Sequence, residues 1–140
     1  MANRSRLDSL VNKLISTCLI KGVQPEDLVT ALFEDEYEDF TVTKNRKTDS
    51  LVVKLSFLET NEEGVSSLHK FRYTYEMSTN NLVKIEQSIG ASRFRTQWNR
   101  AVVIEELMAS IRELISPEDF KRDYFEKLPK DISSKLYLVA

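Results

Sequence analysis

The chain has 140 residues, of which 41% are apolar and 30% charged, with a formal net charge of −2. This length predicts one globular domain, 1–140, with a core large enough to fold without disulfides. No apolar run approaches the roughly 20 residues that a membrane-spanning helix needs, and a single cysteine excludes an internal disulfide. We therefore expect a cytoplasmic protein with no membrane partner.

Residues 1–39 are predicted to form a helical hairpin. Apolar residues in the first segment recur every three or four positions, which is the period of an amphipathic helix. Pro25, followed by two acidic residues, is typical of the start of a second helix. The apolar stripe of the first helix contains Leu7, Leu10, Val11, Leu14, Ile15, Cys18 and Leu19.

Residues 40–90 are predicted to form a sheet, because their apolar period changes from helical spacing to two. Four alternating segments are separated by short polar loops around 44–50, 62–64 and 78–81. Connections this short favour antiparallel neighbours, since parallel strands need a long crossover. The sequence thus predicts a four-stranded antiparallel meander.

Residues 91–129 return to helical spacing and predict a long helix followed by a shorter one. Ser116 and Pro117 are typical of the start of the shorter helix. Residues 130–140 form an apolar tail that we expect to dock on this chain or on a partner. The complete order is ααββββαα, an α+β fold with the helices on one side of the sheet. The long stripe contains Trp98, Ala101, Ile104, Leu107, Met108, Ile111, Leu114 and Ile115, and the shorter one Phe120, Tyr124 and Leu128.

Few residues in the chain favour catalysis. Cys18 lies on an apolar stripe, where a free cysteine usually acts as a small buried side chain. His69, the only histidine, begins the aromatic face of a strand and is expected to be partly buried and hydrogen-bonded to a loop carbonyl. With three glycines there is no glycine-rich phosphate loop. We expect no enzyme, metal or cofactor. A third possibility is a small-ligand protein or enzyme with a pocket lined by His69, Tyr73 and Tyr75.

Charge is strongly segregated along the chain. Residues 25–40 contain seven acidic side chains and no basic one. We expect the densest part of this segment to bind a basic partner, although a solvated helix end is the simpler interpretation. The alternating spacing of a calcium loop is missing. This acidic patch comprises Glu34, Asp35, Glu36, Glu38 and Asp39.

A basic patch is expected on the polar face of the sheet and beside the start of the long helix. Its arginines alternate with two aromatic residues, Phe94 and Trp98, a mixture that can bind a nucleic-acid backbone and stack on its bases. An acidic pI near 5.5 weighs against a dedicated nucleic-acid domain. The patch comprises Lys54, Lys70, Arg72, Lys84, Arg93, Arg95 and Arg100.

Apolar residues outside the inward-facing set indicate either a subunit or partner interface, or a surface that the C-terminal segment folds back to cover. They occur at Leu58, Leu82, 102–104 and the tail. Together with the segregated charge, they favour a non-catalytic protein-interaction or regulatory protein, which we expect to form a homo-oligomer. Nucleic-acid binding through the basic patch is the alternative.

Overall fold

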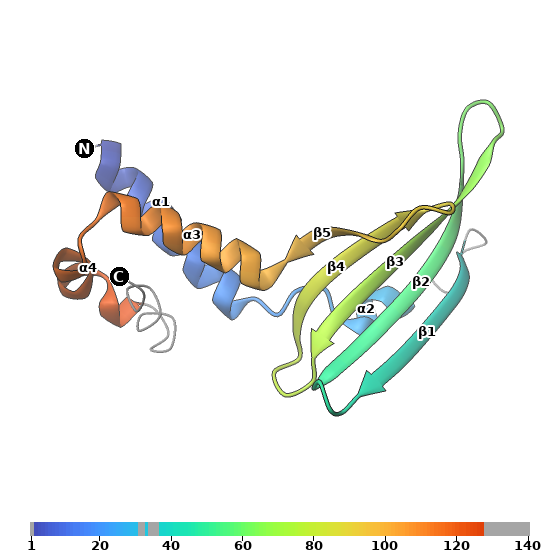
Figure 1. The fold of residues 1–140 in the computed structure, drawn as a ribbon, viewed down its shortest axis with the longest axis horizontal. Coiled ribbons are helices and arrows are strands. Elements are labelled where there is room, and N and C mark those ends of the chain that lie inside the picture. Colours follow the sequence, from blue (N-terminus) through green and yellow to red (C-terminus); the bar gives the residue numbers. More distant parts are fainter. Residues whose placement is uncertain (1, 31–32, 34–36, 128–140) are drawn as a thin grey trace. The chain divides into compact units, whose positions relative to one another are not determined.

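The computed structural model describes residues 2–30, 33 and 37–127 (Figure 1). The chain comprises two compact units, one drawn from Met1–Ile20 with Ala101–Ala140 and the other from Lys21–Arg100. Between them they contain helices and one antiparallel sheet, so the α+β class is confirmed. The predicted apolar tail, 130–140, and Leu128 lie outside the described residues.

The first unit is helical. It contains α1 (Ala2–Leu19), most of α3 (Arg100–Leu114), α4 (Pro117–Asp123) and a short 3-10 turn, η1 (Phe125–Lys127). The Ser116 hydroxyl caps α4 by accepting from the Asp119 N–H at 3.3 Å, as predicted. No helix in the described part of the chain is long and apolar enough to cross a membrane. The buried core residues are Leu7, Val11, Leu14, Leu107, Met108, Ile111, Phe120 and Tyr124.

The second unit is a sheet of five strands in sequence order, where four were predicted (Figure 1). The additional strand, β5, lies in the segment expected to begin the long helix. Trp98 is half-buried, lies opposite Ile85 and packs against the core of the sheet, so it does not belong to the helical stripe. The strands are β1 (Tyr37–Asn45), β2 (Ser50–Thr60), β3 (Ser66–Glu76), β4 (Asn81–Ile89) and β5 (Arg95–Asn99).

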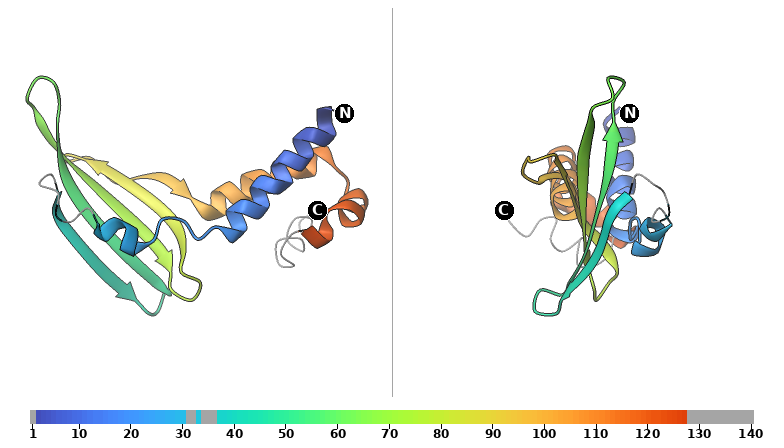
Figure 2. Two further views of the ribbon diagram at one scale, coloured as in Figure 1. Left: turned by 180° about the vertical axis from the view of Figure 1, so that it is seen from behind. Right: turned by 90° about the vertical axis from the view of Figure 1, so that its right-hand side faces the viewer.

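The second helix, α2 (Pro25–Val29), lies on one face of the sheet (Figure 2). Its Leu28 packs against a core formed by Val53, Tyr75 and Leu82. The two helices predicted to pair as a hairpin therefore contribute to different cores, α1 to the helical one and α2 to that of the sheet.

A register shift in the β3–β4 ladder brings Leu82 into the core. Strict alternation assigns Leu82 to the same face as Lys84. The shift beside Thr74 instead pairs Tyr75 with Leu82, which is 3% exposed. Leu82 is thus a core residue. The prediction that it lies outside the inward-facing set is wrong.

Candidate binding face of the sheet

The polar face of the sheet collects much of the predicted basic patch. Lys54 on β2 lies opposite Arg72 on β3, which lies opposite Glu86 on β4. Two residues further along β2, Ser56 lies opposite Lys70. Because alternate residues of a strand share a face, these side chains form two adjacent rows.

Arg72 is neutralised within this face. Its Nε and Nη2 donate to the two carboxylate oxygens of Glu86, each at 2.8 Å, and Lys84 Nζ lies 3.6 Å from the same carboxylate. The hydrogen bonds from Arg72 hold the pKa of Glu86 below its usual range and raise the pKa of Arg72. Bidentate pairs of this kind fix geometry as well as charge. Arg72 and Lys84 are therefore parts of an internal ion-pair network.

Arg100 also has a structural role. It is 8% exposed, its Nε donates to the Leu82 carbonyl at 2.8 Å, and its guanidinium lies 5.4 Å from the centre of the Trp98 ring. Of the seven residues of the predicted basic patch, the exposed ones are Lys54, Lys70, Arg93 and Arg95.

The connection between β4 and β5 folds onto the polar face. Ser88 Oγ donates to the Ser92 carbonyl at 2.7 Å, and the Ile89 N–H donates to Ser92 Oγ at 2.9 Å. These bonds anchor the connection, and the Phe94 ring lies 4.1 Å from the Arg72 guanidinium. Phe94 thus stacks on an arginine of its own chain.

A cavity of about 360 Å³ opens beside Phe94. Ser56 is 5% exposed, and its hydroxyl has no hydrogen-bond partner among the described residues. A buried hydroxyl in that state costs roughly 1–3 kcal/mol. Lys54 and Lys70 flank it, and the described carboxylates form no ion pair with either lysine. The lining residues are Asp39, Thr41, Lys54, Leu55, Ser56, Lys70, Phe71 and Phe94.

The acidic patch does not end a helix where the structure describes it. Glu38 and Asp39 belong to β1, which begins at Tyr37, three residues earlier than predicted. Asp39 lies opposite Ser56 on the same face as Thr41, because alternate residues of a strand share a face, and it lines the lysine-bearing cavity. The two predicted patches therefore meet at Asp39. Glu34, Asp35 and Glu36 lie outside the described residues.

β1 is an edge strand, paired with β2 alone in the described sheet. Every residue of this strand except Tyr37 and Phe40 is exposed, and Val42 retains 50% of its accessible surface. An edge of this kind offers unpaired backbone groups to another strand. Lys44, near its carboxyl end, and Glu38, near its amino end, give the strand opposite charges at its two ends.

His69 lies on the opposite, aromatic face. Its ring stacks on Phe57, with ring centres 5.3 Å apart, and Nε2 lies 3.0 Å from Glu59 Oε2. Gln87 Nε2 lies 3.3 Å from Nδ1. His69 is thus partly buried, as expected, but its hydrogen-bond partners are side chains and not the predicted loop carbonyl. It lines none of the three cavities described here.

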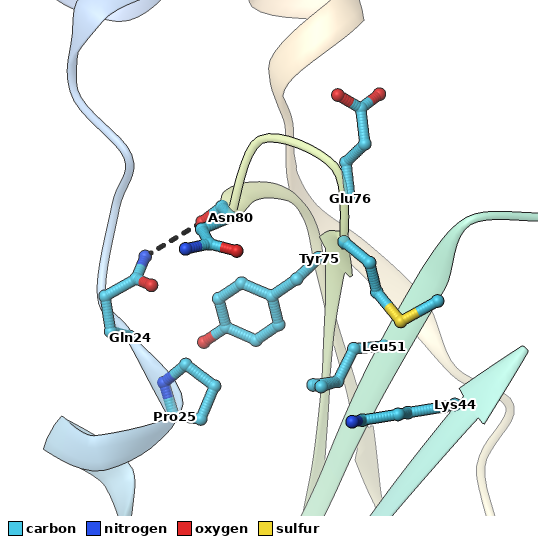
Figure 3. Close-up of a pocket in the computed structure, with 8 residues that line it drawn as sticks. Gln24, Pro25, Lys44, Leu51, Tyr75, Glu76 and Asn80 are labelled. Carbon is cyan, nitrogen blue, oxygen red and sulfur yellow. Dashed lines mark hydrogen bonds between the residues drawn. The ribbon is translucent and has the colours of Figure 1, made fainter. Parts of the chain in front are cut away.

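A second cavity, of about 210 Å³, includes Tyr75 (Figure 3). Gln24 Nε2 donates to the Asn80 carbonyl at 3.1 Å, the dashed line in Figure 3, and the Tyr75 hydroxyl donates to the Val23 carbonyl at 2.7 Å. Burial raises the pKa of the Tyr75 hydroxyl. These hydrogen bonds hold the segment before α2 against β3 and the β3–β4 turn. The polar groups around this cavity therefore have a structural role.

A third cavity, of about 280 Å³, lies in the helical unit. Arg4, Asp119, Arg122 and Asp123 line it and form an ion-pair network, in which Arg4 Nη1 lies 3.1 Å from Asp123 Oδ2. In the part of the chain that the structure describes, no three His, Cys, Asp or Glu side chains gather as metal ligands.

Comparisons of the chain with protein-family models, with curated proteins and with solved structures find no match. The interpretation of the sheet therefore depends on its geometry and charge.

Proposed function

We propose that this chain is a non-catalytic protein-interaction module in which two copies pair through the β1 edge. The observation that carries the proposal is an open, nine-residue edge strand with an acidic and a basic end. Extension of a sheet by a strand from another chain is a common mode of protein recognition.

A second copy is the partner that the charge order of β1 favours. In an antiparallel arrangement with Thr41 opposite its counterpart, Glu38 of each copy lies opposite Lys44 of the other. Val42 then lies opposite Phe40 of the other copy, which would cover its exposed side chain. Opposite charges and apolar pairs at facing positions each stabilise an antiparallel ladder. The same register keeps the polar faces of both sheets on one side.

Analytical ultracentrifugation over a range of concentrations tests this proposal. The wild type should be dimeric. Val42→Lys should shift it toward monomer because an apolar contact is lost, and Lys44→Glu because a glutamate then faces Glu38 of the other copy. The double variant Glu38→Lys, Lys44→Glu exchanges the two charges and should recover the dimer. Lys47→Glu, in the β1–β2 turn, is the matched control and should leave the dimer unchanged.

A wild type that is monomeric at every concentration would contradict pairing of two copies. A dimer unaffected by both Val42→Lys and Lys44→Glu would locate the interface elsewhere. Far-ultraviolet circular dichroism should show that each variant keeps the wild-type fold, so loss of dimer is separated from unfolding.

A further inference from the structure

The polar face of the sheet holds a buried hydrogen-bond donor that has no acceptor in the part of the chain that the structure describes. Ser56 lies on a central part of β2, is 5% exposed, and lines the cavity of about 360 Å³. Its hydroxyl finds no partner among residues 2–30, 33 and 37–127. Buried polar groups are nearly always hydrogen-bonded, so an orphan that lines a cavity indicates a missing acceptor.

Two lysines show which kind of acceptor fits. Lys54 and Lys70 come from adjacent strands and are diagonal neighbours on one face, a spacing of roughly 7–8 Å between backbone positions. Both are exposed, and the carboxylates that the structure describes are not paired with them. The nearby Arg72 is already bound to Glu86. Two unpaired cations around a buried hydroxyl donor favour a ligand oxygen that carries negative charge.

The remaining walls limit the size and character of the ligand. Phe94 contributes an apolar wall, and Thr41 and Asp39 on β1 contribute polar ones. Asp39 leaves one net positive charge among the lining residues and offers an acceptor for a ligand hydroxyl or amine. The cavity volume lies at the small end of the range for small-molecule sites, roughly 300–1,000 Å³.

We propose that this cavity binds a small organic anion whose carboxylate or phosphate group lies between Lys54 and Lys70 and accepts a hydrogen bond from Ser56. Phe94 packs against the apolar part of the ligand, and Asp39 binds its hydroxyl or amine. This site uses the polar face of the sheet and does not depend on pairing through the β1 edge.

Titrations of the full chain followed by ¹H–¹⁵N correlation spectra test the site, with inorganic phosphate, benzoate and glycerol phosphate as probes. At least one probe should give saturable shifts of the amides of Thr41, Lys54, Ser56 and Lys70. Ser56→Ala, Lys54→Met and Lys70→Met should each weaken binding about tenfold, the effect of one charge-assisted hydrogen bond. Lys47→Met removes an exposed lysine outside the cavity and should bind like the wild type.

Ser56→Ala has a second readout that a purely structural hydroxyl would not give. Removing an unpaired buried hydroxyl should leave the unbound protein as stable as the wild type, or more stable, while ligand binding weakens. The two lysine variants alter exposed side chains and keep the test open if the alanine variant does not fold.

Three results would overturn the proposal. One is the absence of saturable shifts with all three probes. Another is wild-type affinity in both the serine and the lysine variants. The third is binding of a single-stranded oligothymidylate, but of none of the small anions, with loss in Arg93→Gln and Arg95→Gln variants. That last result would assign the face to nucleic acid.

Discussion

Gly22 and Leu82 lie so close together that a Cβ atom on Gly22 would come within 2.8 Å of the Leu82 Cβ atom. The Leu82 N–H donates to the neighbouring Lys21 carbonyl at 2.7 Å, and Gly22 has a φ of +86°. The segment before α2 thus lies directly against the start of β4 because this position has no side chain.

Gly22→Ala should therefore destabilise the protein for two reasons, the left-handed backbone and the clash with Leu82. Gly64, with a φ of +82° and nothing within 4 Å of an added Cβ atom, isolates the first effect. We expect Gly22→Ala to lose about 1–3 kcal/mol more than Gly64→Ala, the usual cost of overpacking. Urea unfolding of both variants measures the difference. Equal losses would show that Leu82 moves aside freely.

Glu86→Gln should destabilise the sheet by about 1–3 kcal/mol, because it leaves the guanidinium of Arg72 and the ammonium of Lys84 without their carboxylate. Glu105→Gln is a suitable control. Glu105 is 64% exposed in its ion pair with Arg112, and such pairs contribute roughly 0–1 kcal/mol.

Because of the same network, we expect the stability of the sheet to depend on pH. The pKa of Glu86 is lowered on folding by Arg72, so its contribution is present above the unfolded value, roughly 4.3, and is lost as pH falls through the folded one. The stability gap between wild type and Glu86→Gln should accordingly narrow below about pH 4. Urea unfolding at successive pH values measures the gap, and a constant gap would contradict this assignment.

We expect the contribution of Tyr124 to the stability of the fold to be lost in alkali. Tyr124 is 1% exposed, and burial together with its hydrogen bond to the Asp8 carboxylate raises its pKa to about 12. Because the folded pKa exceeds the unfolded value of about 10, its contribution is present below pH 10 and is lost as pH rises through the folded pKa. Thermal unfolding should show a steeper alkaline decline for the wild type than for Tyr124→Phe. An equal alkaline decline in the wild type and Tyr124→Phe would contradict this role of Tyr124.

We expect the contribution of Asp123 to the stability of the fold to be lost in acid. Hydrogen bonds from Arg122 and then Arg4 lower its pKa to about 2. Its contribution is therefore present above an unfolded value of about 3.9 and is lost as pH falls through the folded one. Carboxyl ¹³C titration should show the Asp123 pKa rising more in Arg122→Gln than in Arg4→Gln. Arg6→Gln should leave it unchanged, and a similar rise there would indicate a general charge effect.

The sequence is sufficient to predict a helix whose buried residues form one continuous apolar stripe. Leu7, Val11 and Leu14 are buried at helical spacing in α1, and Ser116 caps α4 as its side chain predicts. Strand β5 was missed because Trp98 fits both an apolar helix stripe and a strand, and only pairing with β4 distinguishes them.

The candidate site was partly predictable. Period two correctly assigned Lys54 and Lys70 to one face, but the register needed to pair Arg72 with Glu86 depends on turns and bulges. Alternation also predicts an exposed Ser56. Its burial depends on contacts with other parts of the fold, which alternation along β2 does not describe.

The order of the two units along the chain has a consequence for synthesis. The sheet unit, Lys21–Arg100, is one continuous stretch, whereas the core of the helical unit joins Leu7 to Phe120 and Tyr124. During translation the sheet can close while α4 is still inside the ribosome, and α1 must wait for the last helices before its apolar stripe is covered. A nascent chain should therefore acquire its sheet first, with α1 as the segment that a chaperone would protect.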